Sequence, residues 1–365
     1  MSQITLAELE ERLLSYFSKV LSVRDIAYIQ PPVLLREGRI LRTYKFRMTG
    51  VPKEYSKMLI LRLFDAEELP VRPLFEEILH NTLNDQGLPV PRVYFAESSV
   101  DYLTAPFLIM EEVRGESLFD INSVNQKPYM QAARFLISGV GSVARELASV
   151  ALQLHSVTTD QFHEKLKSLK FPIEHLSLNG RLYQLYKRVQ NTKLTGLEPG
   201  IIWLISHGPP DPVKPSLCHG QLYPNNIRKK QDLVDGIINW SMDSIVFGDP
   251  AFDIGRTSAA FKCFVPYVTP ALMRLSFNVG NRFARQFVNA YRQKRAVSKD
   301  KIRYYELMWC MDLAASAGES MTTKSHIYKK EFDEARVDLY KSTANAIEYF
   351  KSETGIPVMI PFTRN

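Results

Sequence analysis

The sequence predicts an α+β fold with a small, β-rich N-terminal lobe followed by a larger, mostly helical lobe. Two observations support this class. Up to about residue 112, short apolar runs of strand length outnumber helical segments. After residue 113, long segments carry apolar residues at helical spacing. We therefore expect two domains, residues 1–112 and residues 113–365, with the boundary near residue 113.

The first lobe is expected to run in the order helix, hairpin, strand, helix, strand, strand. Thr5 and Glu8 form a capping-box pattern before apolar residues at helical spacing. Arg62 stands inside a compact apolar run, where a buried charge needs a partner or a ligand. The expected strands are residues 33–35, 40–48, 58–64, 93–96 and 107–110, with a helix from about residue 70 to residue 87.

The second lobe is expected to be built mainly from helices. A proline-rich loop at residues 209–215 interrupts them. The helical segments with the clearest apolar periodicity are residues 129–156, 271–295, 301–317 and 329–350.

Composition excludes several classes of protein. The 365 residues are enough for two lobes with their own cores. The net charge of +7 suits an anionic partner such as a nucleotide, but no block of five or more like charges supports binding to nucleic acid or to a membrane surface. The three widely spaced cysteines predict buried thiols in a reducing compartment. The acidic N-terminal segment is unlike a signal peptide and no apolar run reaches the length of a membrane span, so we expect a cytoplasmic protein.

The most informative stretch is residues 217–255, where two apolar runs flank a short polar hairpin. It contains His219-Gly220-Gln221-Leu222-Tyr223-Pro224-Asn225-Asn226. The catalytic loop of protein kinases reads H-R-D-x-x-x-x-N, with Asp as the base and Asn on a metal ion. The sequence keeps the spacing, the His and the final Asn, and it has Gln221 in the position of the base.

Further short motifs occur in a characteristic order along most of the chain. They are TYKF at residue 43, LILRL at residue 59, GLPVPRV, FLIMEEVRG, VALQLHSV, CHGQLYPNNI, GIINW and GDPAFDI. Each piece is a weak signal alone, and their order and spacing together are specific. On these motifs the chain resembles the aminoglycoside phosphotransferase and choline-kinase-like family, which implies a bilobal, protein-kinase-like fold.

The resemblance implies a nucleotide site with ATP and Mg²⁺ as candidate cofactors. Arg62 would contact nucleotide phosphates, with Glu76 as its helix partner and Glu77 as the alternative. A structural ion pair between strand and helix explains Arg62 and Glu76 equally well. The hinge that meets the adenine through its backbone would be residues 110–113, which include Met110, Glu111 and Val113.

The sequence departs from the family pattern where carboxylates are expected. Gln221 replaces the Asp of H-G-D, and Gln cannot act as a base at neutral pH, although it can orient a hydroxyl. Asn239 replaces the Asp of I-D-W, which would bridge Mg²⁺ to the phosphates; an amide lacks the charge that this ion favours. Asn226 is the retained metal residue. Asp243 is a candidate replacement, and a solvent-exposed loop acid is the favoured interpretation of it.

The phosphate-covering turn also departs from the pattern, because Gly38 stands alone where related sequences often have several glycines. For His219, Asp249 and Asp253 structural roles in the loop are favoured, with His219 kept as a candidate catalytic residue. His155 is expected to be a packed or capping residue.

Three functions remain open from the sequence. The favoured one is a family member that acts on or binds a small molecule with altered phosphotransfer machinery. The alternatives are a pseudokinase-like binding protein without turnover and an active small-molecule kinase whose missing acids come from elsewhere. The motifs leave open whether the chain is an enzyme, and they do not indicate the acceptor or the oligomeric state.

Overall fold

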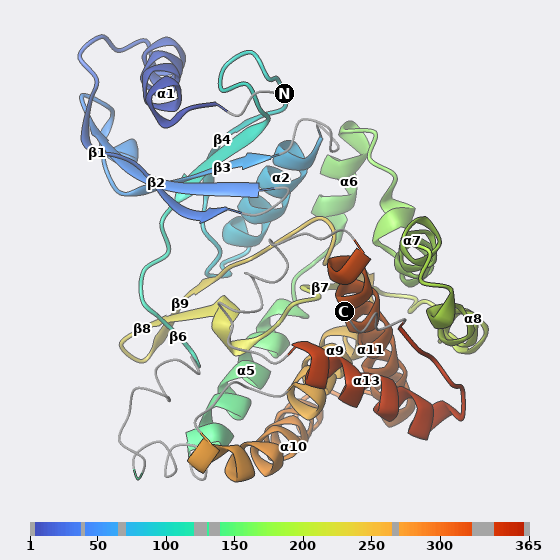
Figure 1. Ribbon diagram of the computed structural model, residues 1–365. Helices are drawn as coiled ribbons and strands as arrows, with labels where there is room; N and C mark the ends of the chain where they lie inside the picture. The colour runs from blue at the N-terminus through green and yellow to red at the C-terminus, as the bar shows by residue number, and fades with distance from the viewer. Residues whose placement is uncertain are drawn as a thin grey trace. The chain divides into compact units, whose positions relative to one another are not determined.

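The computed structural model describes residues 4–37, 41–64, 71–119, 130, 139–264, 270–322 and 339–360 (Figure 1). These residues form two compact units that are each built from more than one stretch of chain. The first comprises Met1–Glu116, Asp160–Phe171 and Arg228–Met242. The second comprises Ser117–Thr159, Pro172–Ile227 and Asp243–Asn365. The architecture is mixed α+β, with the large sheet near the N-terminus and helices predominating after it, as the sequence predicts.

The first unit is organised on an antiparallel sheet of five strands in the order β1-β2-β3-β5-β4. The strands are β1 (Ala27–Glu37), β2 (Leu41–Thr49), β3 (Leu59–Phe64), β4 (Val93–Glu97) and β5 (Phe107–Glu111). The unit's helices are α1 (Leu6–Leu21), α2 (Arg72–Asp85) and α6 (Asp160–Ser168). The sheet confirms each predicted strand except for its exact ends, and Gly38 lies outside the described residues.

Strand β3 explains why helices lie against both faces of this sheet. Successive side chains of a strand point to opposite faces. Leu59, Leu61 and Leu63 therefore share one face, and they belong to the apolar cluster that includes Leu9, Leu13 and Phe17 of α1. Arg62 points to the other face, where its guanidinium meets α2.

Helix α1 begins as the sequence predicts. The Thr5 hydroxyl accepts a hydrogen bond from the backbone N–H of Glu8, and the Glu8 carboxylate accepts one from the backbone N–H of Thr5. This reciprocal capping box satisfies two N–H groups that have no partner within the helix.

Strand β1 begins earlier than predicted, at Ala27 instead of residue 33. Pro31 and Pro32 make this segment look unlike a strand, because proline cannot donate to a sheet. The strand tolerates them because β1 lies at the edge of the sheet and its register to β2 shifts between Gln30 and Val33.

The second unit is mainly helical. Its helices are α5 (Val140–Leu154), α7 (Leu178–Asn191), α8 (Glu198–His207), α9 (Ala251–Cys263), α10 (Pro270–Arg292), α11 (Lys299–Thr322) and α13 (Leu339–Thr354). Strands β7 (Ser216–Cys218) and β10 (Val246–Gly248) form an antiparallel pair. A further sheet has the order β6-β8-β9, from β6 (Glu116–Ser117), β8 (Ile227–Lys230) and β9 (Leu233–Ile237). Strand β9 and all of β8 after Ile227 belong to the first unit, and β6 spans the boundary between the two units.

The long helices lie where the sequence predicts them, but some of their boundaries differ from the predicted ones. Helix α5 covers the C-terminal half of the helix expected at residues 129–156, and most of the remainder lies outside the described residues. The first ten residues of the helix expected at 329–350 also lie outside them. Helix α9 was not predicted, because its 13 residues are mostly buried on every side and show no polar face.

Helices α9 and α11 pack unusually closely at Gly255. A Cβ atom at this position would lie 2.5 Å from the carbonyl oxygen of Ile302, so only glycine allows the approach. Within the described ranges, no helix combines the length and the apolar character needed to cross a membrane.

Candidate active site

The loop predicted as the catalytic loop follows strand β7 in the second unit. Pairing of Cys218 with Val246 in β10 fixes the end of this strand. The next residues turn sharply and end in the short 3-10 helix Pro224–Asn226. This local structure brings His219 and Gly220 to the start of α9.

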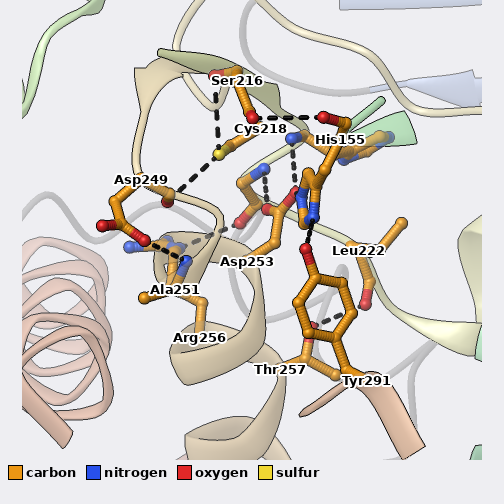
Figure 2. Close-up of polar contacts among 12 residues, drawn as sticks. His155, Ser216, Cys218, Leu222, Asp249, Ala251, Asp253, Arg256, Thr257 and Tyr291 are labelled. Carbon is orange, nitrogen blue, oxygen red and sulfur yellow. Dashed lines mark hydrogen bonds and ion pairs between the residues drawn. The ribbon is translucent and has the colours of Figure 1, made fainter. Parts of the chain in front are cut away.

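Asp253 of α9 is the anchor of this loop (Figure 2). Its Oδ2 accepts hydrogen bonds from the backbone N–H of His219 at 2.8 Å and from Nε2 of His155 at 3.0 Å. Its Oδ1 accepts one from the backbone N–H of Gly220 at 2.6 Å. Asp253, His219 and His155 are all buried. The carboxylate therefore fixes the loop backbone from inside the unit, which confirms the structural role predicted for Asp253.

The electrostatics of this cluster favour an ionised Asp253. Burial alone raises the pKa of Asp253, but the hydrogen bond and charge of His155 and the nearby His219 outweigh burial, so the pKa lies below its ordinary value. Burial also raises the pKa of Tyr291, so its hydroxyl stays protonated. That hydroxyl lies 2.8 Å from Nδ1 of His155, and Nε2 of the same ring lies 3.0 Å from Oδ2 of Asp253. His155 is thus a packed, oriented residue, as predicted.

Gly220 provides a backbone conformation that other residues rarely adopt. Its φ is +77°, and a Cβ atom would lie 1.9 Å from the carbonyl oxygen of Ser244. Two further residues of α9 hold the same turn: Arg256 donates from Nε to the Gly220 carbonyl at 2.9 Å, and Thr257 donates to the Leu222 carbonyl at 2.8 Å. Helix α9 therefore holds the loop at His219, Gly220 and Leu222.

Gln221 and Asn226 are joined within this loop. The amide nitrogen of Asn226 donates to the backbone carbonyl of Gln221 at 2.8 Å, and the Gln221 N–H donates to Nδ1 of His219 at 3.2 Å. Asn226 is buried, while Gln221 is half-buried. The loop is thus closed by its own side chains, and the residue in the position of the base is an amide.

The predicted nucleotide residues lie in the first unit. Arg62 Nη1 of β3 is 2.6 Å from Glu76 Oε2 of α2, and both residues are buried. Glu76 is therefore the partner of Arg62 in this pair. Burial raises the pKa of Glu77, and the nearby Glu97 adds to the effect.

The predicted hinge, residues 110–113, begins with the last two residues of strand β5. Met110 pairs with Ile60 of β3, and the backbone N–H of Glu111 donates to the Arg92 carbonyl at 3.0 Å. The side chain of Glu111 forms an ion pair with Lys57 at 2.7 Å. Val113 packs against Gly236, where a Cβ atom would lie 2.2 Å from Cγ1 of Val113.

The predicted metal residues are divided between the units: Asn239 belongs to the first, and Asn226 and Asp243 belong to the second. Asn239 is exposed and has a φ of +67°, a conformation in which Asn and Asp are enriched. The following residue, Trp240, is fully buried and donates from Nε1 to the Ile237 carbonyl at 2.8 Å. Asp243 is exposed, and its charge acts on Arg181.

These three residues offer Mg²⁺ a single carboxylate, that of Asp243. Asn226 and Asn239 offer neutral amide oxygens, whereas Mg²⁺ is usually held by one or two carboxylates. In the described part of the chain, the residues that come close enough to share a metal ion are His155, Cys218 and Asp253. Both Asp253 oxygens already accept N–H groups, and burial raises the pKa of the Cys218 thiol well above its ordinary value. That cluster is a hydrogen-bonded support of the loop.

The sequence does not reveal several residues that support the loop. Tyr291 of α10 and Asp312 of α11 come from helices distant in sequence, and Arg256 of α9 forms an ion pair with Asp312. Their side chains carry no motif. The sequence points to Arg256 only in that this residue follows the G-D-P-x-x-D motif. Cys218, Cys263 and Cys310 are buried free thiols, as predicted.

Fold and loop together define a protein of the kinase-like class. Residues 33–300 match the sequence model of the phosphotransferase enzyme family, APH. Because that match covers well over half of the chain, the protein belongs to this family. A search of curated proteins gives no significant match.

Solved structures agree on the fold. A candidate aminoglycoside phosphotransferase from Ralstonia eutropha superposes with a TM-score of 0.59 at 15% identity, covering 94% of this chain and 98% of that one. Aminoglycoside phosphotransferase APH(4)-Ia, in a complex with AMP-PNP and hygromycin B, gives 0.56 at 14% identity, covering 95% and 99%. APH(2")-IIa with streptomycin and ATP gives 0.54 at 16% identity, covering 96% and 99%. At these identities the likeness shows the fold alone.

Proposed function

We propose that this protein binds a small molecule, retains a nucleotide site of the kinase-like type, and transfers phosphoryl groups slowly. The observation that carries the proposal is the Asp253-anchored loop. Its backbone is held by Asp253, Arg256 and Thr257, while the side chain in the position of the base is Gln221. The hydrogen bonds from α9 hold the loop in place, but the position of the catalytic base carries an amide and no carboxylate.

The chemistry of Gln221 sets the expected rate. General base catalysis typically contributes about a hundred- to ten-thousandfold. A neutral amide cannot accept the proton of a substrate hydroxyl at neutral pH, but it can hydrogen-bond that hydroxyl and orient it. Binding of an acceptor is therefore retained in this proposal, and chemical transfer is slowed.

The nucleotide is assigned to the first unit. Arg62 would contact its phosphates while held by Glu76, and residues 110–113 would meet the base. The related structures were solved with ATP, AMP-PNP or GDP, which supports a nucleotide as the ligand class. Because Asn239 is an amide where the family resemblance places an Asp, Mg²⁺ is expected to add little to nucleotide affinity, and Asp243 is the one carboxylate in the proposed metal set.

A second candidate is a binding protein with no turnover. The observation that favours it is that both amide substitutions fall on positions where the family resemblance places working acids. This candidate and the first differ only in whether a slow transfer occurs.

The experiment is a phosphotransfer assay combined with a thermal-shift panel of nucleotides and metabolites, with and without Mg²⁺. We expect turnover well below the 1–100 s⁻¹ that is typical of kinases, at about the hundredfold deficit or more that loss of a base predicts. We expect ATP to raise the melting temperature weakly, with little dependence on Mg²⁺. Turnover at ordinary kinase rates, or a large Mg²⁺-dependent shift, would contradict the proposal and favour an active kinase with acids from elsewhere.

A further inference from the structure

A cavity of about 660 Å³ lies among α9, α10, α11 and α13 of the second unit. Its size is within the range of small-molecule sites, roughly 300–1,000 Å³. The charged residues that line it are Lys262, Arg285, Arg292, Lys299, Arg303 and Glu306. Five cations against one carboxylate give this lining a net charge of +4.

The one carboxylate is already compensated by its neighbours. Glu306 is buried and its Oε1 lies 2.6 Å from Nζ of Lys262. Ser258 and Tyr349 also donate hydrogen bonds to its oxygens, each at 2.5 Å. Burial and the Glu306 charge raise the pKa of Tyr349, so this hydroxyl remains a donor. Glu306 therefore does not neutralise the remaining cations of the cavity.

The other cations of the lining differ in the ion pairs and hydrogen bonds that they form. Arg303 forms an ion pair with Glu353, and Arg292 donates from Nε to the Val297 carbonyl at 3.0 Å. Arg285 and Lys299 are exposed, and within the part of the chain that the structure describes they form no ion pair. Like charges that share a concave surface repel one another and raise the local concentration of anions.

The uncharged lining is also suited to an anion. Asn278, Asn281 and Asn289 of α10 add amide groups that can donate hydrogen bonds. Guanidinium groups bind planar or tetrahedral oxyanions through two parallel N–H bonds. The cavity therefore combines a net positive charge with side chains that can donate hydrogen bonds to an oxyanion.

The cavity is separate from the loop described above. Asp253, Arg256 and Thr257 bond the loop from one side of α9. Ser258 and Lys262, which are four residues apart, share a different side and face the cavity. A ligand in the cavity would thus occupy another surface of the helix that holds the loop.

We propose that this cavity is a binding site for a small, multiply charged oxyanion, carried by a phosphate ester or a polycarboxylate. The inference does not rest on the function proposed above. It also excludes a polycationic molecule from this cavity, since the net positive charge of the lining would repel it.

Isothermal titration calorimetry without divalent metal tests the site, with inorganic pyrophosphate and citrate as separate probes. The informative variant is Arg285→Gln with Lys299→Gln, because both side chains are exposed and their replacement leaves the core unchanged. The matched control is Lys187→Gln with Lys214→Gln, which removes the same charge from exposed positions of the same unit that do not line the cavity.

We expect wild type and control to bind at least one probe, with affinity that falls as NaCl rises. Each lost cation should weaken binding about fivefold to tenfold, so the cavity variant should bind at least about 25-fold more weakly. Binding of pyrophosphate alone would identify a phosphate ligand, and binding of citrate alone a carboxylate ligand. Failure of both probes to bind wild type, or equal loss in the control and the cavity variant, would overturn the inference. A failed phosphotransfer assay would leave these outcomes unaffected.

Discussion

The role of Asp253 as the anchor of the loop can be tested by Asp253→Asn. The carboxylate accepts three hydrogen bonds, from His155, His219 and Gly220, and it is fully buried. An asparagine offers one oxygen and one NH₂ group, so at least one of these donors faces another donor. Breaking a buried charged pair costs about 3–5 kcal/mol. We therefore expect the free energy of unfolding of the second unit to fall by about that amount.

Chemical denaturation at several pH values measures this change, with Asp211→Asn as a control that removes an exposed acid of the same unit. Because the folded-state pKa of Asp253 is lowered, its stabilisation is fully present above the unfolded pKa of about 3.9 and is lost as the pH falls through the folded pKa. The difference between wild type and Asp253→Asn should thus be constant from about pH 5 to pH 7 and shrink below about pH 4. A difference below about 1 kcal/mol at pH 7, or one that does not shrink in acid, would refute the reasoning.

Two further substitutions test the close packing of the loop and the strand–helix ion pair. Gly220→Ala should lower stability by more than about 2 kcal/mol, because it combines a positive φ with a Cβ atom 1.9 Å from the Ser244 carbonyl. Gly87→Ala, at φ +83° with no atom within 4 Å, should cost only about 1 kcal/mol in the same denaturation experiment; equal costs would contradict the steric argument. Arg62→Met should cost about 3–5 kcal/mol by leaving Glu76 buried without this cation, and a double-mutant cycle with Glu76→Gln should give a coupling energy above about 1 kcal/mol. Additive effects in that cycle would show that the pair is not coupled.

Local signals in the sequence predicted local structure well. The Thr5–Glu8 box predicts the start of α1 because both partners lie within one helical turn. The charge of Arg62 in a buried run predicts a partner, and Glu76 provides it. The first prediction succeeds because the residues that cap α1 lie within one turn of each other. The second succeeds because a charged residue inside an apolar run needs a partner wherever that partner lies in the sequence.

The sequence did not predict features that depend on contacts between distant parts of the chain. Tyr291 and Asp312 act on the loop through His155 and Arg256, from helices that nothing in the motif identifies. Strand β1 extends through two prolines because it is an edge strand, which only the sheet order reveals. The cationic cavity likewise arises from residues on four helices that no local pattern connects.

We propose that the protein keeps the kinase-like architecture while Gln221 and Asn239 stand where the family resemblance places two working acids. Calorimetric titration of ATP, with and without Mg²⁺, into wild type and the variant Gln221→Asp with Asn239→Asp tests it most directly. We expect wild type to show little effect of Mg²⁺, and the acid-restored variant to bind ATP at least about tenfold more tightly when Mg²⁺ is present. The same weak, metal-independent affinity in both proteins would contradict the claim that the rest of the site is intact.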